Sequence, residues 1–328
     1  MLTGVSSNYS HWVVESLQCV AGQSLPQEAS TLMLATIEPY LQANTEVLEH
    51  EHYLEFPISN PSEAIQANAH YFNQPEWAEE YLTYCHRSES FLERWQAALG
   101  DISDSIVVDI GCGPGNIFAT LPAKPRLLIG IDVASTSLEL ARGKDYLPIL
   151  ADATQLPFVS HFADVVVLNA ALHHCENMDA ILQEAARLVK PGGLLVSDHD
   201  PQLSAWDYKG VAKLLWQGRL LYYKIIGHGF HKTNEQQHWG LKCEIHHKPG
   251  HGVTQKFFHE TLQPLGFDVK VYPHNHELGA EVLQGQLGRA ELKYRMGNLL
   301  SGRNPQASTS ALSLMCVARK NNKNLLID

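Results

Sequence analysis

An apolar run that leads into a glycine-rich turn limits the possible folds of this chain more than any other segment. The run from Val107 to Ile110 is β-branched apart from Asp109, and Gly111, Gly113 and Gly115 follow it at alternate positions. Such a run is typical of a buried strand. Glycines after a strand let backbone N–H groups approach a ligand closely. The segment therefore predicts a strand that ends in a ligand-binding loop.

The spacing of these glycines argues against two other glycine-rich loops. Asn116 stands where the dinucleotide fingerprint G-x-G-x-x-G requires its third glycine. The Gly-Lys-Ser/Thr ending of a phosphate-binding P-loop is also missing. A nicotinamide-dependent oxidoreductase is therefore only a remote alternative.

Apolar runs and helical segments alternate along the chain after residue 105. Helices are predicted at residues 135–142, 180–189 and 206–226, the second ended by a Lys-Pro-Gly-Gly turn and the third amphipathic. Buried runs that alternate with helices predict a parallel sheet covered on both faces, with ligands at the carboxyl ends of its strands. The predicted strands are residues 106–110, 126–132, 147–152, 164–169, 194–198, 266–272 and 311–319.

The loop, taken with two later strings, resembles the class I S-adenosylmethionine (SAM)-dependent methyltransferases. Their motif I is written (V/I/L)-L-D-(I/V/L)-G-C-G-x-G, and residues 107–115 follow it. The string 151–158 is similar to the family's D-A-x-x-L-P-F, and 189–193 to its L-K-P-G-G turn. The resemblance is to the type 11 branch, which includes ubiquinone- and menaquinone-biosynthesis enzymes, and covers residues 105–200 and the strands near 267 and 312. It implies a seven-stranded, Rossmann-like doubly wound α/β sheet and SAM as cofactor.

The resemblance also implies roles for individual residues. The three glycines would surround the methionine part of SAM, with Asp109 near its amino group. Asp132 would hold the ribose hydroxyls, because two carboxylate oxygens can accept from both. Cys112, inside the loop, is interpreted as a packing residue where a small side chain is needed. The predicted cofactor site is Asp109, Gly111, Cys112, Gly113, Gly115, Asp132, Val133 (against the adenine), Asp152 and Ala153 (at the adenine edge), and Asn169 and Ala170 (beside the methionine part).

Two adjacent histidines are the candidates for a general base. His173 and His174 follow the fourth predicted strand, where the acceptor of such a fold faces the methyl group. Imidazole titrates near neutral pH and suits proton transfer. A polar loop position that only orients the backbone is the alternative. Asp198 and His199, after the fifth strand, are the next candidates.

The composition also limits the kinds of partner, metal and cellular location that are expected. The formal net charge is -11 and no dense Lys/Arg block is present, so a nucleic-acid partner is not expected. The six cysteines form no CxxC pair, which favours reduced thiols. His246, His247, His251 and His259 are close in sequence but lack a metal-site framework, so no metal is predicted. With no signal-like start and no membrane-length apolar run, a cytoplasmic location is expected.

These observations divide the chain into five parts. Residues 1–100 are predicted to be a helical N-terminal cap, in which 81–99 forms a packing helix or a wall over the site. Residues 101–200 are the cofactor-binding core, 201–260 a His-rich insert and possible acceptor lid, 261–320 the last part of the sheet with a helix over 281–300, and 321–328 a tail that frays.

The predicted function is methyl transfer from SAM to a small or medium-sized organic acceptor, whose attacking atom stays open. The oligomeric state also stays open. Protein or RNA methylation, and a non-catalytic protein that binds SAM or its demethylated product, are the alternatives. The Asn/Asp-Pro-Pro-Tyr motif of base-amine methylation is not present at Asn169–Leu172.

Overall fold

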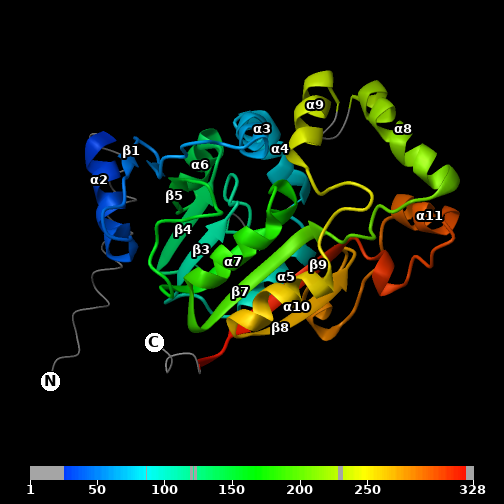
Figure 1. Ribbon diagram of the computed structural model, residues 1–328. Helices are drawn as coiled ribbons and strands as arrows, with labels where there is room; N and C mark the ends of the chain where they lie inside the picture. The colour runs from blue at the N-terminus through cyan, green and yellow to red at the C-terminus, as the bar shows by residue number, and fades with distance from the viewer. Residues whose placement is uncertain (1–25, 86, 119–120, 122–123, 228–231, 323–328) are drawn as a thin grey trace.

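The computed structural model describes residues 26–85, 87–118, 121, 124–227 and 232–322. Within these residues one mixed sheet of nine strands runs through the molecule in the order β1-β2-β5-β4-β3-β6-β7-β9-β8 (Figure 1). The strands are β1 (Leu48–Glu49), β2 (Leu54–Glu55), β3 (Ile106–Ile110), β4 (Leu127–Asp132), β5 (Leu147–Leu150), β6 (Ala163–Asn169), β7 (Val189–Pro201), β8 (Phe267–His274) and β9 (Ser313–Lys320).

The seven strands from β3 to β9 are those predicted from the sequence, and the doubly wound α/β fold is confirmed. The five strands from β3 to β7 run parallel. β9 is antiparallel to both of its neighbours, β7 and β8. Every residue of β3 is buried, as expected for a central strand with helices on both faces.

The helices bury their apolar faces on the two sides of this sheet. Phe91 and Trp95 of α5 pack on one side, and Met33 of α2, Leu182 of α7 and Phe258 of α10 pack on the other. The helices are α2 (Pro26–Ile37), α3 (Glu63–Phe72), α4 (Pro75–Cys85), α5 (Glu89–Leu99), α6 (Ser135–Arg142), α7 (Met178–Leu188), α8 (Gly210–Ile226), α9 (Asn234–Cys243), α10 (Gln255–Leu262) and α11 (Leu292–Leu300), with short 3-10 turns η1 (Glu38–Tyr40), η2 (Leu172–His174), η3 (Gln263–Leu265), η4 (Ala280–Gln284) and η5 (Ser308–Ser310).

The N-terminal hundred residues differ from the helical prediction. β2 pairs in parallel with β5, and β1 pairs with β2, so this region extends the sheet by two strands. Each strand has only two residues, too few to show an alternating pattern. The helix predicted over 81–99 is two helices, because the Ser88 hydroxyl accepts a hydrogen bond from the Phe91 N–H and starts α5 anew.

The region after β7 also differs in detail. The helix predicted from Trp206 begins at Gly210. The helix predicted over 281–300 is the turn η4, an irregular stretch and then α11. α9 was not predicted, although Thr233 and Gln236 form a capping box that starts it.

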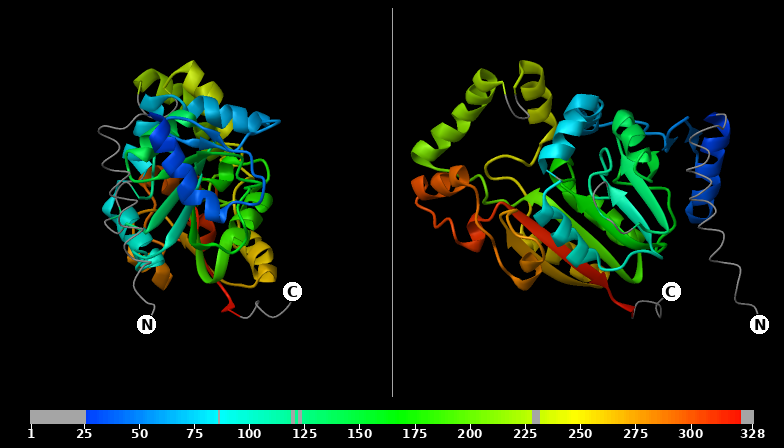
Figure 2. Two further views of the ribbon diagram at one scale, coloured as in Figure 1. Left: turned by 90° about the vertical axis from the view of Figure 1, so that its left-hand side faces the viewer. Right: turned by 180° about the vertical axis from the view of Figure 1, so that it is seen from behind.

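Figure 2 shows α8 and α11 together at one end of the molecule and α2 at the other. No helix of the described residues has both the length and the apolar composition to cross a membrane. Four described cysteines, Cys112, Cys175, Cys243 and Cys316, are free thiols. Cys19, the Cys85 side chain, the first 25 residues and most of the predicted tail (323–328) lie outside the described part.

Candidate active site

A cavity of about 310 Å³ opens at the carboxyl ends of β3, β4, β5 and β6. We call it the strand-end cavity. The loops after the four strands form its floor, and α3 and the turn at His174 form its walls. The predicted cofactor residues that line it are Gly111, Gly113, Asp132, Val133, Asp152, Ala153, Asn169 and Ala170. The structure thus brings together residues that are spread over sixty positions of the sequence.

The glycine loop is shaped so that side chains would not fit. Gly111 and Gly113 have φ of +70° and +52°, values that favour glycine. A Cβ on Gly111 would lie 2.7 Å from the Ala171 Cβ, and one on Gly113 would lie 2.9 Å from Asn116 Nδ2. The bare backbone therefore forms one wall of the cavity. Asn116 Oδ1, buried in the same wall, has no hydrogen-bond partner within the described residues.

Gly115 has a different surrounding. Its φ is +87°, and a Cβ there would meet the ring of Tyr146 at 3.0 Å. Gly115 does not line the strand-end cavity. The small size of Gly115 therefore leaves room for the Tyr146 ring, rather than for a ligand in the cavity.

Asp132 is fixed at the end of β4 by three backbone N–H groups. Oδ2 accepts from Gly113 at 2.8 Å, and Oδ1 accepts from Val133 and Ala134 at 2.8 and 2.9 Å. Burial raises the pKa of Asp132, and these three hydrogen bonds oppose the rise. A carboxylate has about four acceptor sites, so this one can still accept from a ligand hydroxyl.

Asp109 lies beneath the loop rather than in the cavity. Its Oδ2 accepts a hydrogen bond from the Tyr146 hydroxyl at 2.7 Å, and its Oδ1 is buried without a partner among the described residues. Burial raises the pKa of Asp109 to about 7. Cys112 is also buried away from the cavity, and burial raises the pKa of its thiol. Neither residue contacts the space in which the sequence predicts the methionine part.

The β5 and β6 ends complete the floor. Asp152 Oδ1 accepts from the Thr154 N–H at 2.9 Å and from its hydroxyl at 2.8 Å, which fixes the turn that follows β5. Ala170 has φ of +54°, and its N–H donates to the Asp198 carbonyl at 2.8 Å. This strained turn carries the chain from β6 into the histidine pair.

The two histidines have different positions. His174 lines the cavity, and its Nδ1 lies 3.1 Å from the Cys243 carbonyl oxygen. A carbonyl only accepts, so Nδ1 carries the proton and Nε2 is left with a lone pair. Burial, together with His173, lowers the pKa of His174 to about 3. His174 is therefore a neutral imidazole with a fixed tautomer.

His173 is buried and does not line the cavity. Its backbone N–H and its Nδ1 lie 3.0 and 2.8 Å from Asp200 Oδ1. Burial lowers the pKa of His173 to about 3 and raises that of Asp200 to about 7. This pair holds the turn in place.

Asp198 and His199, the further candidates, belong to a buried network that the sequence did not reveal. Arg94 Nε donates to Asp198 Oδ2 at 2.9 Å, and His274 Nε2 lies 2.7 Å from Asp198 Oδ1. Burial opposes the ionisation of Asp198, but Arg94, His274 and His199 outweigh it and hold its pKa well below the usual range. The signal was present in the sequence, because Arg94 interrupts an apolar helix face between Phe91 and Trp95.

Helix α3 supplies cavity residues that sequence reasoning missed. Ser62, Asn68 and Phe72 line the strand-end cavity. The Asn68 side-chain amide donates to the His174 carbonyl at 3.1 Å, and the Phe72 ring lies edge-on to His174 at 5.5 Å. α3 thus holds the histidine turn from above.

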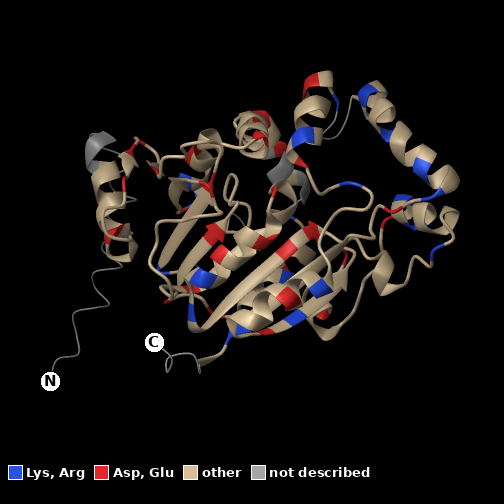
Figure 3. Ribbon diagram, viewed as in Figure 1, with Lys and Arg blue, Asp and Glu red and all other residues tan. Residues whose placement is uncertain are grey.

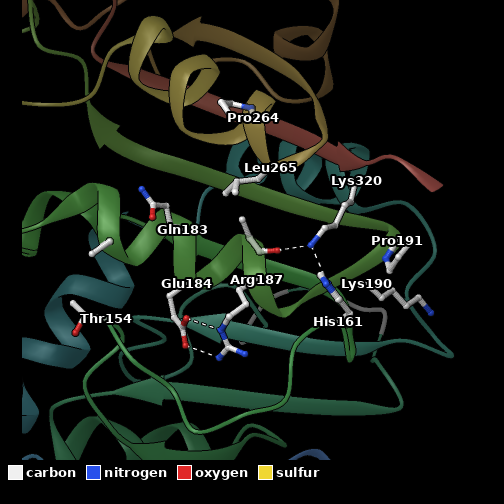
Figure 4. Close-up of a pocket in the computed structure, with 12 residues that line it drawn as sticks. Thr154, His161, Gln183, Glu184, Arg187, Lys190, Pro191, Pro264, Leu265 and Lys320 are labelled. Carbon is white, nitrogen blue, oxygen red and sulfur yellow. Dashed lines mark hydrogen bonds and ion pairs between the residues drawn. The ribbon is translucent and has the colours of Figure 1, made fainter. Parts of the chain in front are cut away.

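A second cavity of about 1130 Å³ is lined by residues of α7, the start of β7, η3 and the end of β9 (Figure 4). Its cationic groups are already paired. The Lys320 ammonium donates to the carbonyls of Ala186 and Val189, both at 2.9 Å. Arg187 pairs with Glu184 at 2.7 Å. Glu184, the carboxylate that lines this groove, is therefore occupied by Arg187.

The histidines after α9 form no metal centre in the described residues. His246 Nδ1 lies 3.3 Å from His251 Nδ1, and His246 Nε2 lies 3.1 Å from the Cys175 carbonyl. His247 stacks on Trp206 at 5.2 Å. These rings pack the insert against the histidine turn.

Comparison with known proteins agrees with this geometry. A family model described as a methyltransferase domain matches residues 108–197. Residues 108–197 are a class I methyltransferase domain. The cofactor of this class is SAM. The matched segment runs from β3 through most of β7 and contains the glycine loop, Asp132, Asp152 and the histidine pair.

Curated relatives of the methyltransferase domain have diverse names. The biotin-biosynthesis bifunctional protein BioHC of Saccharophagus degradans is 29% identical over 57% of this chain and 34% of its own length. A tRNA (carboxymethyluridine(34)-5-O)-methyltransferase of Arabidopsis thaliana is 31% identical over 29% and 24%. A ubiquinone biosynthesis O-methyltransferase of Nitrosomonas europaea is 31% identical over 29% and 43%. This chain spans less than half the length of each.

Proposed function

We propose that this protein transfers a methyl group from SAM to a small or medium-sized organic acceptor. One observation carries the proposal: the strand-end cavity joins a side-chain-free loop, the fixed Asp132 carboxylate and the His174 imidazole around one space. The residues fit the cofactor, because the loop leaves room for backbone contact and Asp132 retains acceptor capacity. SAM supplies a methyl group on a sulfonium, whose leaving group is a neutral thioether that needs no acid.

The cofactor would be held by residues at the ends of four strands, β3 to β6. Gly111 and Gly113 would face the methionine part, and Asp132 would accept from the ribose hydroxyls. Val133, Asp152 and Ala153 would surround the adenine, with Asn169 and Ala170 beside the methionine part. Asp109 would act through the loop that covers it, since its carboxylate lies outside the cavity.

His174 is the proposed proton acceptor. The Cys243 carbonyl keeps its Nδ1 protonated, so Nε2 could take a proton from an acceptor hydroxyl, amine or acidic carbon as the methyl group moves. The lowered pKa means that the imidazole is neutral at any pH near neutrality, so that Nε2 carries no proton there. His173 would position it through the Asp200 pair rather than act on the acceptor.

Enclosure of the cavity supports a small acceptor. α3 and α9 pack together over the histidine turn, with the His70 and Trp239 rings stacked at 4.0 Å. Water exclusion and alignment of the reacting atoms are what methyl transfer requires of its enzyme. The ubiquinone-biosynthesis relative supports the same acceptor class, while the tRNA relative keeps RNA as the alternative.

Calorimetry with SAM and with its demethylated product tests the first half of the proposal. Transfer of labelled methyl groups to pooled small metabolites, and separately to tRNA and to protein, tests the second. Product in the metabolite pool, lost in His174→Gln while SAM affinity is kept, is the expected result. SAM binding with no labelled product in any pool would instead identify a non-catalytic binding protein.

A further inference from the structure

Helix α8 presents an apolar face to solvent, the reverse of the usual arrangement in a globular protein. The side chains of Leu214 and Ile225 are 68% and 74% exposed. Spacings of three and four residues place the exposed apolar side chains on one helical stripe. The stripe is Val211, Leu214, Leu215, Leu221, Tyr222, Ile225 and Ile226.

The opposite side of α8 is packed, so the orientation of the stripe is fixed. Ala212 is buried, and Trp216 stacks on Trp206 at 4.8 Å and meets the Tyr208 ring at 5.6 Å. The Arg219 guanidinium lies 4.0 Å from the centre of the Trp216 ring. Rotation of α8 to hide its apolar stripe would break this aromatic cluster.

Helix α11 continues the apolar surface. Leu292, Met296, Leu299 and Leu300 are exposed and fall on one stripe of this helix. The two helices are in contact, and the Lys209 N–H donates to the Ser301 hydroxyl at 2.9 Å. The right-hand view in Figure 2 shows them together, at the end of the molecule away from α2. We call the two stripes together the α8–α11 face.

The charges on these helices all have one sign. α8 carries Lys213, Arg219 and Lys224, α11 carries Lys293 and Arg295, and neither helix contains Asp or Glu. Figure 3 shows blue but no red along α8. Glu291, directly before α11, pairs with Lys293 at 2.9 Å. The whole chain has 35 acidic and 24 basic residues, so the two helices themselves differ in sign from the chain as a whole.

We propose that the α8–α11 face binds the surface of an anionic lipid bilayer. An amphipathic helix with an apolar stripe and a basic flank lies in the membrane interface, its apolar side chains among the acyl chains and its cations at the anionic headgroups. A second copy of this chain is a poorer occupant. A two-fold contact would bring basic flank against basic flank, with no acidic side chain of these helices to balance it.

Co-sedimentation of the full chain with vesicles tests the proposal. One set of vesicles is phosphatidylcholine alone, and the other contains one quarter phosphatidylglycerol. We expect binding to the anionic vesicles that is weakened by salt, and at least tenfold weaker binding to the neutral ones. Absence of binding to both sets, or equal binding to both, would overturn the proposal.

Variants identify the surface. The double variant Leu214→Glu/Ile225→Glu should lower binding to anionic vesicles by roughly tenfold or more, and Lys213→Glu by roughly tenfold or less. Leu48→Glu is the matched control, because Leu48 is an exposed leucine (42%) in β1, far from α8, and it should bind as the wild type does. Unchanged binding of the double variant would overturn the assignment.

Two further measurements distinguish the lipid surface from the other candidate partners of this face, a second copy of the chain and an acidic protein. Light scattering without lipid reports self-association, and a concentration-dependent dimer abolished by the double variant, with vesicle binding intact, would assign the face to a second copy. Binding to an acidic carrier protein that exceeds binding to vesicles would assign it to a protein partner. Thermal unfolding and SAM calorimetry confirm that each variant is folded.

Discussion

The strand-end cavity buries polar groups, whereas the α8–α11 face exposes apolar side chains. Around the cavity, carboxylates and backbone groups are buried and held by short hydrogen bonds, as with Asp132 and its three N–H donors. On the α8–α11 face, the side chains of leucines and isoleucines are exposed to solvent. Each region departs from the ordinary rule that polar groups lie outside and apolar groups inside. Such departures mark places where a protein meets something other than water.

The largest difference between the two regions should appear when a side chain is added to each. Gly113→Val places a β-branched residue at φ of +52° and a Cβ within 2.9 Å of Asn116 Nδ2. We expect SAM affinity to fall by more than about 100-fold, or roughly 2.7 kcal/mol, in calorimetry. Gly218→Val in α8, where an added Cβ would meet no atom of another segment within 4 Å, is the control and should bind SAM normally. A Gly113 variant that still binds would remove the loop from the site.

The next largest effect should come from the charge of one carboxylate. Asp132→Asn keeps the size of the side chain but replaces one acceptor oxygen by an NH2 group, and so loses charge-assisted hydrogen bonds, which contribute about 1.5–3 kcal/mol. SAM affinity should therefore fall about tenfold to 100-fold by calorimetry. Asp164→Asn, at the opposite edge of the sheet where its Oδ2 accepts from the Ile106 N–H at 2.9 Å, serves as the control. Equal affinities for the wild type and Asp132→Asn would end the ribose assignment.

The buried histidines should make the stability of the cavity region depend on pH. Burial holds the pKa of His174 at about 3 in the folded state, against about 6.5 in the unfolded chain. Between these values only the unfolded chain binds the proton, so the free energy of unfolding falls as the pH falls, by up to about 1.4 kcal/mol per pH unit.

Urea unfolding at about pH 6, 5 and 4 measures this dependence. His174→Gln should flatten the slope by about one proton, because glutamine has nothing to protonate. Asp200, whose pKa burial raises to about 7, acts in the opposite direction: its contribution is complete below about pH 3.9 and is lost as the pH rises through 7. Parallel slopes for the wild type and the His174 variant would show that His174 is not buried as a neutral group.

The sequence predicted the cofactor half of the molecule well because its signals are local. Residues 106–110 show their strand in five consecutive positions, and the glycine spacing fixes the loop after it. The strand ends then follow from topology, since the carboxyl ends of parallel strands meet at one edge. The predicted site residues that the structure places outside the cavity are ones whose side-chain direction decides the contact, such as Asp109, which accepts a hydrogen bond from Tyr146.

The contacts that the N-terminal helices make with the core could not be predicted, because the residues that meet are far apart in the sequence. Asn68 meets the His174 carbonyl across 106 positions, and Arg94 meets Asp198 across 104. The apolar pattern of 206–226 predicted a helix correctly, but a pattern alone does not say whether its stripe faces a core or solvent. That distinction needed the packing of Trp216 against Trp206.

The smallest effect should come from truncating the α8–α11 face. Leu214→Ala removes a side chain that is 68% exposed, so the free energy of unfolding should change by no more than about 0.5 kcal/mol. Leu195→Ala in β7, where the side chain is fully buried, should cost about 2–5 kcal/mol. Urea unfolding of the two variants makes the comparison. A cost above about 1 kcal/mol at Leu214 would mean that α8 packs its stripe within the protein. A negligible cost would mean that the stripe contributes nothing to folding, and that its apolar character serves contact with something outside the chain.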